Sequence, residues 1–176
     1  MSDAPQKELI LGMMPTSSGF GFVLFEGLDA PLDWGVRYVK PADNRKALRK
    51  LERLIAWYEP DVLVVEAPTG PGASRSRRVR ALVQAAVRLA DRRGIKVCQY
   101  TAGEVHAMFR SFDAQTKYDR ASTIARWLPA LKAVLPAKRK IWLPENPRMS
   151  IFDAVALVLT HYYVTDLPGE MLLKAE

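Results

Sequence analysis

The chain has 176 residues, 49% of them hydrophobic, which is enough for one compact domain over 1–176 and too little for two. No window approaches the roughly 18 apolar residues of a membrane helix, and the first eight residues are polar, so we expect neither a membrane span nor a signal peptide. Cys98 is the single cysteine, which excludes a disulfide framework and fits a cytoplasmic location, while the net charge of +7 points to an anionic partner.

The first quarter of the chain predicts three strands. Residues 9–14 and 19–25 are largely apolar and are joined by a tight turn at 15–18. Residues 32–39 alternate polar and apolar side chains, as a half-exposed strand does. The close spacing of the three segments predicts an antiparallel meander.

The rest of the chain alternates helices with strands. Apolar residues recur at helical spacing after Asn44, a favourable N-cap residue, and stop at Pro60. The run at 61–66 has the near-continuous apolar core of a strand covered on both faces, and a shorter strand is expected at 95–100. Further helices are predicted at about residues 76–93, 102–112, 118–135 and 149–164. This order predicts one mixed sheet with helices on its faces.

Two carboxylates stand at the ends of apolar elements. Glu66 ends the strand at 61–66, and Asp153 opens the apolar part of the last helix. A carboxylate at the tip of such an apolar strand is more often a site residue than a structural one. Asp153 has the alternative role of a first-turn acid that the helix dipole favours. We interpret Glu66 and Asp153 as candidate catalytic residues and metal ligands.

These segments together resemble the RuvC-type Holliday-junction resolvases of the RNase H-like superfamily. Residues 10–15 (Ile-Leu-Gly-Met-Met-Pro) resemble the opening motif of the family, residues 61–66 resemble the second motif with its metal-binding glutamate, and residues 153–161 resemble the closing motif. The resemblance covers about residues 9–164, the expected ordered core. It implies an α/β fold, an RNase H-like mixed sheet of an antiparallel meander plus parallel strands, flanked by helices. It also implies a homodimer, since resolvases cut two strands symmetrically.

Two positions depart from the pattern of the family. Met14 stands where the resemblance places a catalytic aspartate, and Ser150 stands where it places another aspartate, one turn before Asp153. The chemistry that the resemblance implies uses two magnesium ions about 4 Å apart, held by hard oxygen ligands. A thioether is neutral and soft and does not replace a carboxylate there. We therefore expect a degenerate catalytic set, weak magnesium binding at Glu66 and Asp153, and impaired nuclease activity.

Positive charge is clustered along the sequence. Four arginines lie within residues 74–80 and three cations within 138–140, and both clusters lead into elements that carry site residues. This placement favours a nucleic acid partner, DNA or branched DNA, over ordinary solvated surface. The resemblance adds a basic position before the penultimate helix. The predicted nucleic-acid-binding residues are Arg75, Arg77, Arg78, Arg80, Lys117, Arg120, Lys138, Arg139 and Lys140.

Other conspicuous side chains are interpreted as packing residues. These are Trp57, Trp127 and Trp142, together with His161 two turns after Asp153. Trp142 has a second interpretation, because an aromatic ring beside a basic run can stack on an exposed base.

Three functions remain open from the sequence. The first is a nucleic-acid-binding protein with a degenerate nuclease centre. The second is a working magnesium-dependent, structure-selective endodeoxyribonuclease that recruits Asp113, Asp119 or Glu145 as a replacement ligand. The third is an assembly or phosphate-ligand-binding protein without nuclease chemistry. Cleavage of a branched duplex separates the first two, and salt-dependent DNA binding separates both from the third.

Overall fold

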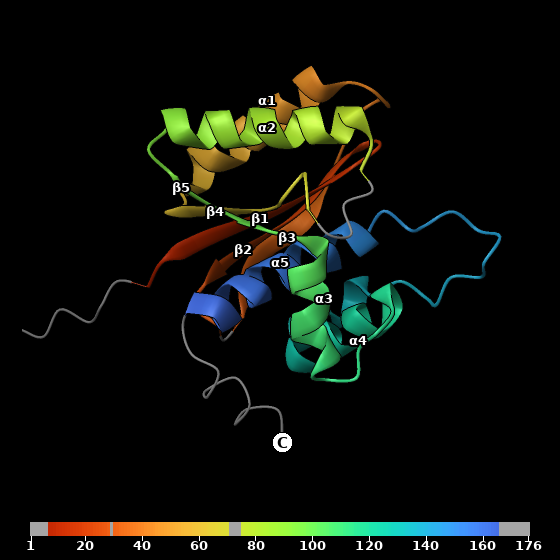
Figure 1. The fold of residues 1–176 in the computed structure, drawn as a ribbon. Helices are drawn as coiled ribbons and strands as arrows, with labels where there is room; N and C mark the ends of the chain where they lie inside the picture. The colour runs from red at the N-terminus through yellow and green to blue at the C-terminus, as the bar shows by residue number, and fades with distance from the viewer. Residues whose placement is uncertain (1–6, 29, 71–74, 166–176) are drawn as a thin grey trace, which may run out of the picture.

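The computed structural model describes residues 7–28, 30–70 and 75–165, and its centre is a five-stranded mixed sheet (Figure 1). The strands are β1 (Leu9–Thr16), β2 (Gly19–Glu26), β3 (Pro31–Tyr38), β4 (Val62–Glu66) and β5 (Lys96–Tyr100). They lie in the order β3-β2-β1-β4-β5. The first three form an antiparallel meander, and β4 runs parallel to both β1 and β5. The predicted mixed sheet is confirmed.

Helices cover both faces of this sheet (Figure 1). On one face lie α1 (Asn44–Tyr58) and α2 (Arg77–Arg92). On the other face lie α3 (Ala102–Arg110), α4 (Lys117–Trp127) and α5 (Met149–Thr165). Within the described ranges, no helix is long and apolar enough to cross a membrane.

The alternation of side chains along each strand gives each face its own apolar core. Leu11 and Met13 of β1 belong to the core under α1 and α2, whereas Ile10 and Met14 belong to the core against α5. Helix α5 is buried on nearly all sides: from its start through residue 162, every residue is buried except the partly exposed Asp153. A helix that is apolar all round suits this central place.

The close approach of α5 to the sheet depends on Gly12 in β1. A Cβ atom at this position would lie 2.6 Å from Val158 Cγ2 and 2.9 Å from the carbonyl oxygen of Ala154. We expect Gly12→Ala to lower the free energy of unfolding by about 2 kcal/mol, measured by urea denaturation, because overpacking a dense core costs this much. Gly35→Ala on β3, where the nearest atom would be 3.2 Å away, should cost clearly less. Equal losses from both variants would contradict this account of the packing.

Helix α3 ends at Arg110 rather than at residue 112, and two other helix boundaries differ from the sequence prediction for identifiable reasons. The N-cap of α1 is Asp43 rather than Asn44, since the Asp43 side chain accepts a hydrogen bond from the Lys46 amide. Helix α4 ends at Trp127 instead of continuing to residue 135, and the chain goes on as the 3-10 helix η1 (Pro129–Val134). The physical reason is Pro129, which has no N–H for the helical hydrogen bond.

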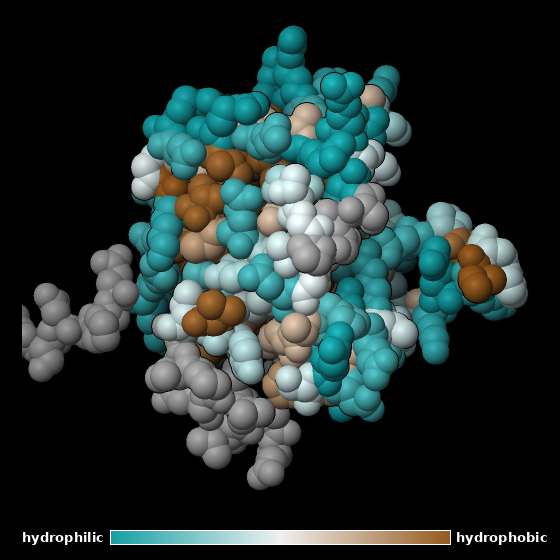
Figure 2. Space-filling model, in the orientation of Figure 1, coloured by the Kyte–Doolittle hydropathy of each residue, from teal (hydrophilic) through white to brown (hydrophobic). Residues whose placement is uncertain are grey.

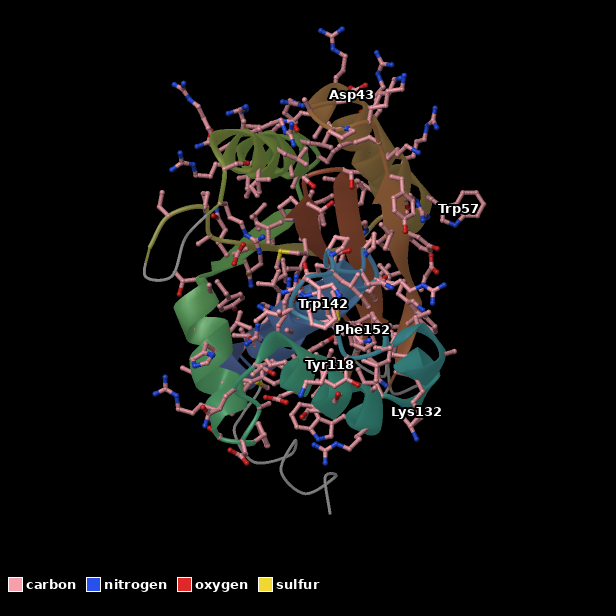
Figure 3. The ribbon with its side chains drawn as sticks, turned by 90° about the vertical axis from the view of Figure 1, so that its right-hand side faces the viewer. Asp43, Trp57, Tyr118, Lys132, Trp142 and Phe152 are labelled. Carbon is pink, nitrogen blue, oxygen red and sulfur yellow. The ribbon has the colours of Figure 1, made fainter. Side chains whose placement is uncertain are left out.

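The packing interpretation of the tryptophans is right for one and wrong for two. Trp127 stacks on Phe109 and meets Phe112 edge-on. Trp57 on α1 is 80% exposed and Trp142 is 73% exposed. Figure 3 shows the Trp57 ring pointing away from the body of the molecule. Large aromatic rings at such exposure need an explanation other than the core.

Candidate functional site

The candidate site lies where the parallel strands β1 and β4 end. Met13 pairs with Val65 across these strands, so Met14 and Glu66, one residue further along, stand at the same end of the sheet. Met14 and Val64 belong to the core against α5, and Glu66 shares that face because side chains alternate. In α/β folds the carboxyl ends of parallel strands are the usual place for a ligand site.

A cavity of about 260 Å³ connects these strand ends to α5. Met14, Glu66 and Asp153, the three motif positions at which the resemblance places acidic site residues, all line it. The remaining lining residues come from the segment before α2 and from α3, α4 and α5: Arg75, Ala102, Val105, Lys117, Arg120, Ala156 and Leu157. Acidic and basic side chains therefore share one small space.

Glu66 is held by Arg75. The Arg75 Nε donates a hydrogen bond to Glu66 Oε2 at 2.8 Å, and Arg75 Nη2 lies 3.4 Å from Met14 Sδ. The Glu66 side chain is only 11% exposed, so this charge-assisted pair is largely shielded from water. One guanidinium thus contacts both strand ends.

Asp153 is held by Lys117. The Lys117 Nζ lies 2.9 Å from Asp153 Oδ2 and 2.8 Å from Glu145 Oε1. Burial raises the pKa of Asp153, and the neighbouring ammonium opposes that rise. Burial lowers the pKa of Lys117, but the charges of Asp153 and Glu145 more than compensate and leave it above its usual value. The ammonium therefore stays charged at neutral pH.

The charges around the cavity balance each other. Glu66, Asp153 and Glu145 are the acids at the site, and Arg75, Lys117 and Arg120 are the cations. Each of the two carboxylates that line the cavity has a protein cation within 3 Å. The site therefore neutralises its own carboxylates.

A magnesium pair does not fit this donor set. Magnesium takes hard oxygen ligands in octahedral geometry, and the thioether of Met14 is soft. Arg75 and Lys117 already stand against the two carboxylates, and a cationic metal would be repelled by both. Within the part of the chain that the structure describes, no three His, Cys, Asp or Glu side chains are grouped so that they could hold a metal ion.

Ser150 lies beside the cavity rather than in its wall. It is buried, and its Oγ donates a hydrogen bond to the Pro147 carbonyl at 2.6 Å. A Cβ atom on Gly21, the β2 residue that pairs with Met14, would lie 2.4 Å from that Oγ. Position 150, where the resemblance places an aspartate, therefore holds a buried serine packed tightly against the sheet.

Of the three candidate replacement ligands, only Glu145 is linked to the site by a salt bridge among the described residues. It reaches Asp153 through Lys117. Asp119 caps α4 instead: its Oδ2 accepts a hydrogen bond from the Thr116 amide at 2.9 Å. Asp113 has a left-handed backbone, with φ +57°, in the turn after α3.

The remaining predicted cations lie outside the cavity. Arg77 and Arg80 are exposed at the start of α2, and Arg78 Nη2 donates to the Ser17 carbonyl at 3.0 Å. The other three stand in an exposed stretch of residues 137–148 between η1 and α5: Lys138, Arg139 and Lys140. Apart from the half-buried Arg78, these cations are exposed and can meet a polyanion.

Sequence reasoning missed two features of the site. It placed Arg75 with the DNA-binding cations, whereas the structure pairs this arginine with Glu66. It also overlooked the exposed apolar residues Ile141 and Leu143 beside the basic run. Their signal in the sequence is an apolar triplet between lysine and proline, without helical or strand periodicity. His161 is buried, with its Nδ1 2.8 Å from the Tyr100 hydroxyl, in line with a packing role.

The strand order and the placing of the helices on both faces of the sheet give this chain an RNase H-like fold, the fold of the RuvC-type resolvases. Among solved structures, the chain is similar to RuvC of Thermus thermophilus, with a TM-score of 0.62, 19% identity, and coverage of 87% of this chain and 92% of that one. A complex of T. thermophilus RuvC with a Holliday junction substrate gives a TM-score of 0.65 at 16% identity, over 89% and 94% of the two chains. The yeast mitochondrial Holliday junction resolvase Ydc2 gives 0.60 at 13% identity, over 89% and 78%.

The resemblance predicted from the motifs is thus confirmed at the level of the fold. No protein-family model and no curated protein matches the sequence.

Proposed function

We propose that this protein binds branched DNA such as a Holliday junction and that its nuclease activity is impaired. The main observation behind this proposal is that both carboxylates of the cavity are paired with protein cations, Glu66 with Arg75 and Asp153 with Lys117. The exposed cations outside the cavity support a polyanionic partner. The fold supports DNA, since one of the similar structures is a complex with a Holliday junction substrate.

The chemistry of the pairs explains the proposed impairment. Hydrolysis of a phosphodiester needs a group that activates water and a group that stabilises the developing charge. Charged arginine and lysine are donors only, so Arg75 and Lys117 cannot take a proton from water. They can hold phosphate oxygens, which makes the site better suited to binding a strand than to cutting it.

A binding and cleavage assay tests this function. We expect the wild-type chain to bind a four-way junction more tightly than a linear duplex of the same sequence, with affinity that falls as salt rises, and to leave both uncut in magnesium. Affinity that does not depend on salt would instead favour the assembly or phosphate-ligand function. Robust cleavage that Glu66→Gln abolishes would establish the active nuclease.

The active endonuclease remains the second candidate because of Glu145. This carboxylate lies in the exposed stretch before α5 and already contacts Lys117, which contacts Asp153. If DNA binding drew Lys117 onto a phosphate, Glu145 and Asp153 would be left as adjacent hard ligands, which is the kind of set magnesium takes. Glu145→Gln would then abolish junction cleavage, whereas it would leave junction binding in place.

The arginines at the start of α2 should contribute to binding through phosphates. We expect Arg77→Gln, Arg78→Gln and Arg80→Gln together to reduce the dependence of log affinity on log salt by about one for each phosphate that the variant no longer neutralises. The reduction should be the same for different sequences, since interactions with the DNA backbone carry no sequence information. Arg75 is excluded from the variant because it holds Glu66. An unchanged salt slope in fluorescence anisotropy would show that this surface does not face DNA.

The proposal includes a homodimer, because a four-way junction presents two equivalent strands. Light scattering of the purified protein should then give twice the 19.8 kDa of one chain. A monomer that binds junctions with one-to-one stoichiometry would remove this part of the proposal.

A further inference from the structure

The stretch between η1 and α5 projects from the body of the molecule (Figure 1) and carries apolar side chains in the open. Ile141 is 90% exposed, Trp142 is 73% exposed and Leu143 is 48% exposed. In Figure 2 hydrophobic atoms gather at the end of this projection, apart from the rest of the surface. We name residues 138–143 the tip. Burying three such side chains against a partner would be favourable.

The tip has a defined local structure. The Leu143 amide donates to the Lys140 carbonyl at 3.0 Å, and Arg139 Nη1 donates to the Leu143 carbonyl at 2.9 Å. The Lys140 Nζ lies 5.5 Å from the centre of the Trp142 ring, within reach of a cation–π contact. These contacts hold the aromatic ring at the end of a turn instead of letting it fold back onto the core.

The chemistry of the tip fits nucleic acid. Residues 136–144 contain three cations and no acid, so phosphates are attracted to the tip, whereas the equally basic tip of a second copy is repelled from it. An aromatic ring flanked by aliphatic side chains is the kind of surface on which bases stack, or which enters between unstacked base pairs. Intact duplex offers no exposed base faces, whereas a branch point does.

The tip is also linked to the cavity. Glu145, two residues beyond Leu143, bonds Lys117, and Lys117 bonds Asp153. Beyond it, the Asn146 carbonyl accepts from the Met149 amide at 2.9 Å and so fixes the entry into α5. DNA held by the tip would therefore have a fixed position relative to the cavity.

We propose that the tip is a wedge that stacks Trp142, supported by Ile141, on bases exposed at the branch point of DNA, while Lys138, Arg139 and Lys140 hold the adjacent phosphates. The inference rests on the proposed binding of branched DNA and assigns its preference for branches to one side chain. Trp57 provides a matched control, because it is a second exposed tryptophan, on α1 (Figure 3).

The test compares Trp142→Ala, Trp142→Phe and Trp57→Ala in binding to a four-way junction and to a linear duplex of the same sequence. Stacking on one base corresponds to roughly tenfold in affinity. We expect Trp142→Ala to lose about tenfold on the junction and less than twofold on the duplex, and Trp142→Phe to retain most of the junction affinity. Trp57→Ala should match the wild type on both, and 2-aminopurine at the branch point should change its emission with wild type but not with Trp142→Ala.

Each other outcome overturns the wedge in a different way. Wild-type junction binding that Trp142→Ala leaves unchanged would remove the wedge and keep the proposed function. Equal losses on junction and duplex would make the tip a general contact. Loss of self-association, or loss of binding to anionic lipid vesicles with DNA binding intact, would assign the tip to a dimer or a membrane surface. A wild-type chain that binds neither the four-way junction nor the linear duplex would overturn the proposed function and the wedge together.

Discussion

Replacing Lys117 with methionine should lower the free energy of unfolding at about pH 7.5 by roughly 2–4 kcal/mol, because it leaves the buried carboxylate of Asp153 without its cation. The Asp153 side chain is 11% exposed, so water cannot replace the missing ammonium fully. Methionine keeps the length and apolar stem of lysine, which limits the change to the charge. Urea denaturation gives the loss directly.

The loss of stability in Lys117→Met should depend on pH, and the raised pKa of Asp153 sets the direction of this dependence. Burial raises this pKa and Lys117 opposes the rise, so in Lys117→Met it lies still further above its value in the unfolded chain. A carboxyl group with a raised pKa destabilises the fold while it is ionised, and the cost disappears as the pH falls through the folded pKa towards the unfolded value of about 3.9. The difference between variant and wild type should therefore shrink as the pH falls from neutral towards the unfolded-state pKa of about 3.9.

Two further variants separate the ion pair from other effects. Lys117→Met with Asp153→Asn should recover part of the lost stability at neutral pH. Its stability should also change less with pH in this range than that of Lys117→Met, because the buried charge at position 153 is gone. Lys138→Met removes an exposed cation and should change stability by less than about 0.5 kcal/mol. A Lys117→Met variant as stable as wild type at pH 7.5 would show that this ion pair does not hold the site together.

The sequence predicted the fold because its signals were local and mutually consistent. The apolar run at 61–66 is a strand with both faces covered, and the structure places β4 between β1 and β5 under helices. The end of α4 was predicted too far along the chain although Pro129 was visible. Helical spacing of the apolar residues continued past it, and Leu131 is buried from η1 rather than from α4.

The family resemblance pointed to Met14, Glu66 and Asp153 as site positions, whereas their partners could not be predicted. The contact between Arg75 and Glu66 depends on how the segment after β4 returns to the strand end, and no periodicity encodes that path. Trp142 was assigned to packing, with stacking on an exposed base as its second interpretation. Residues 137–148 are exposed, and no element in the described part of the chain covers the tip.

The second large effect is expected at Met14. Met14→Asp alone should leave the affinity for Mn²⁺ within about threefold of wild type, because Arg75, whose Nη2 lies 3.4 Å from the Met14 sulfur, would pair with the new carboxylate as it does with Glu66. Combining Met14→Asp with Arg75→Gln removes that cation. Three carboxylates would then line one cavity, and their mutual repulsion favours a divalent ion. We expect this double variant to bind Mn²⁺ at least tenfold more tightly than wild type.

Calorimetric titration with Mn²⁺ measures this difference, and a rise in melting temperature with Mn²⁺ gives an independent readout, since an ion that binds only the folded chain stabilises it. The matched control is Met14→Leu with Arg75→Gln, which removes the same guanidinium without adding a carboxylate. Its affinity for Mn²⁺ should be about tenfold lower than that of Met14→Asp with Arg75→Gln. Cleavage is a poorer readout, because Ser150 remains packed against Gly21 and supplies no acid. If Met14→Asp alone binds Mn²⁺ as tightly as the double variant, Arg75 does not compete with metal, and the missing aspartate by itself explains the state of the site. If neither variant gains affinity, the carboxylates that line this cavity are too far apart or too constrained to share an ion, and the loss of metal chemistry would extend beyond Met14.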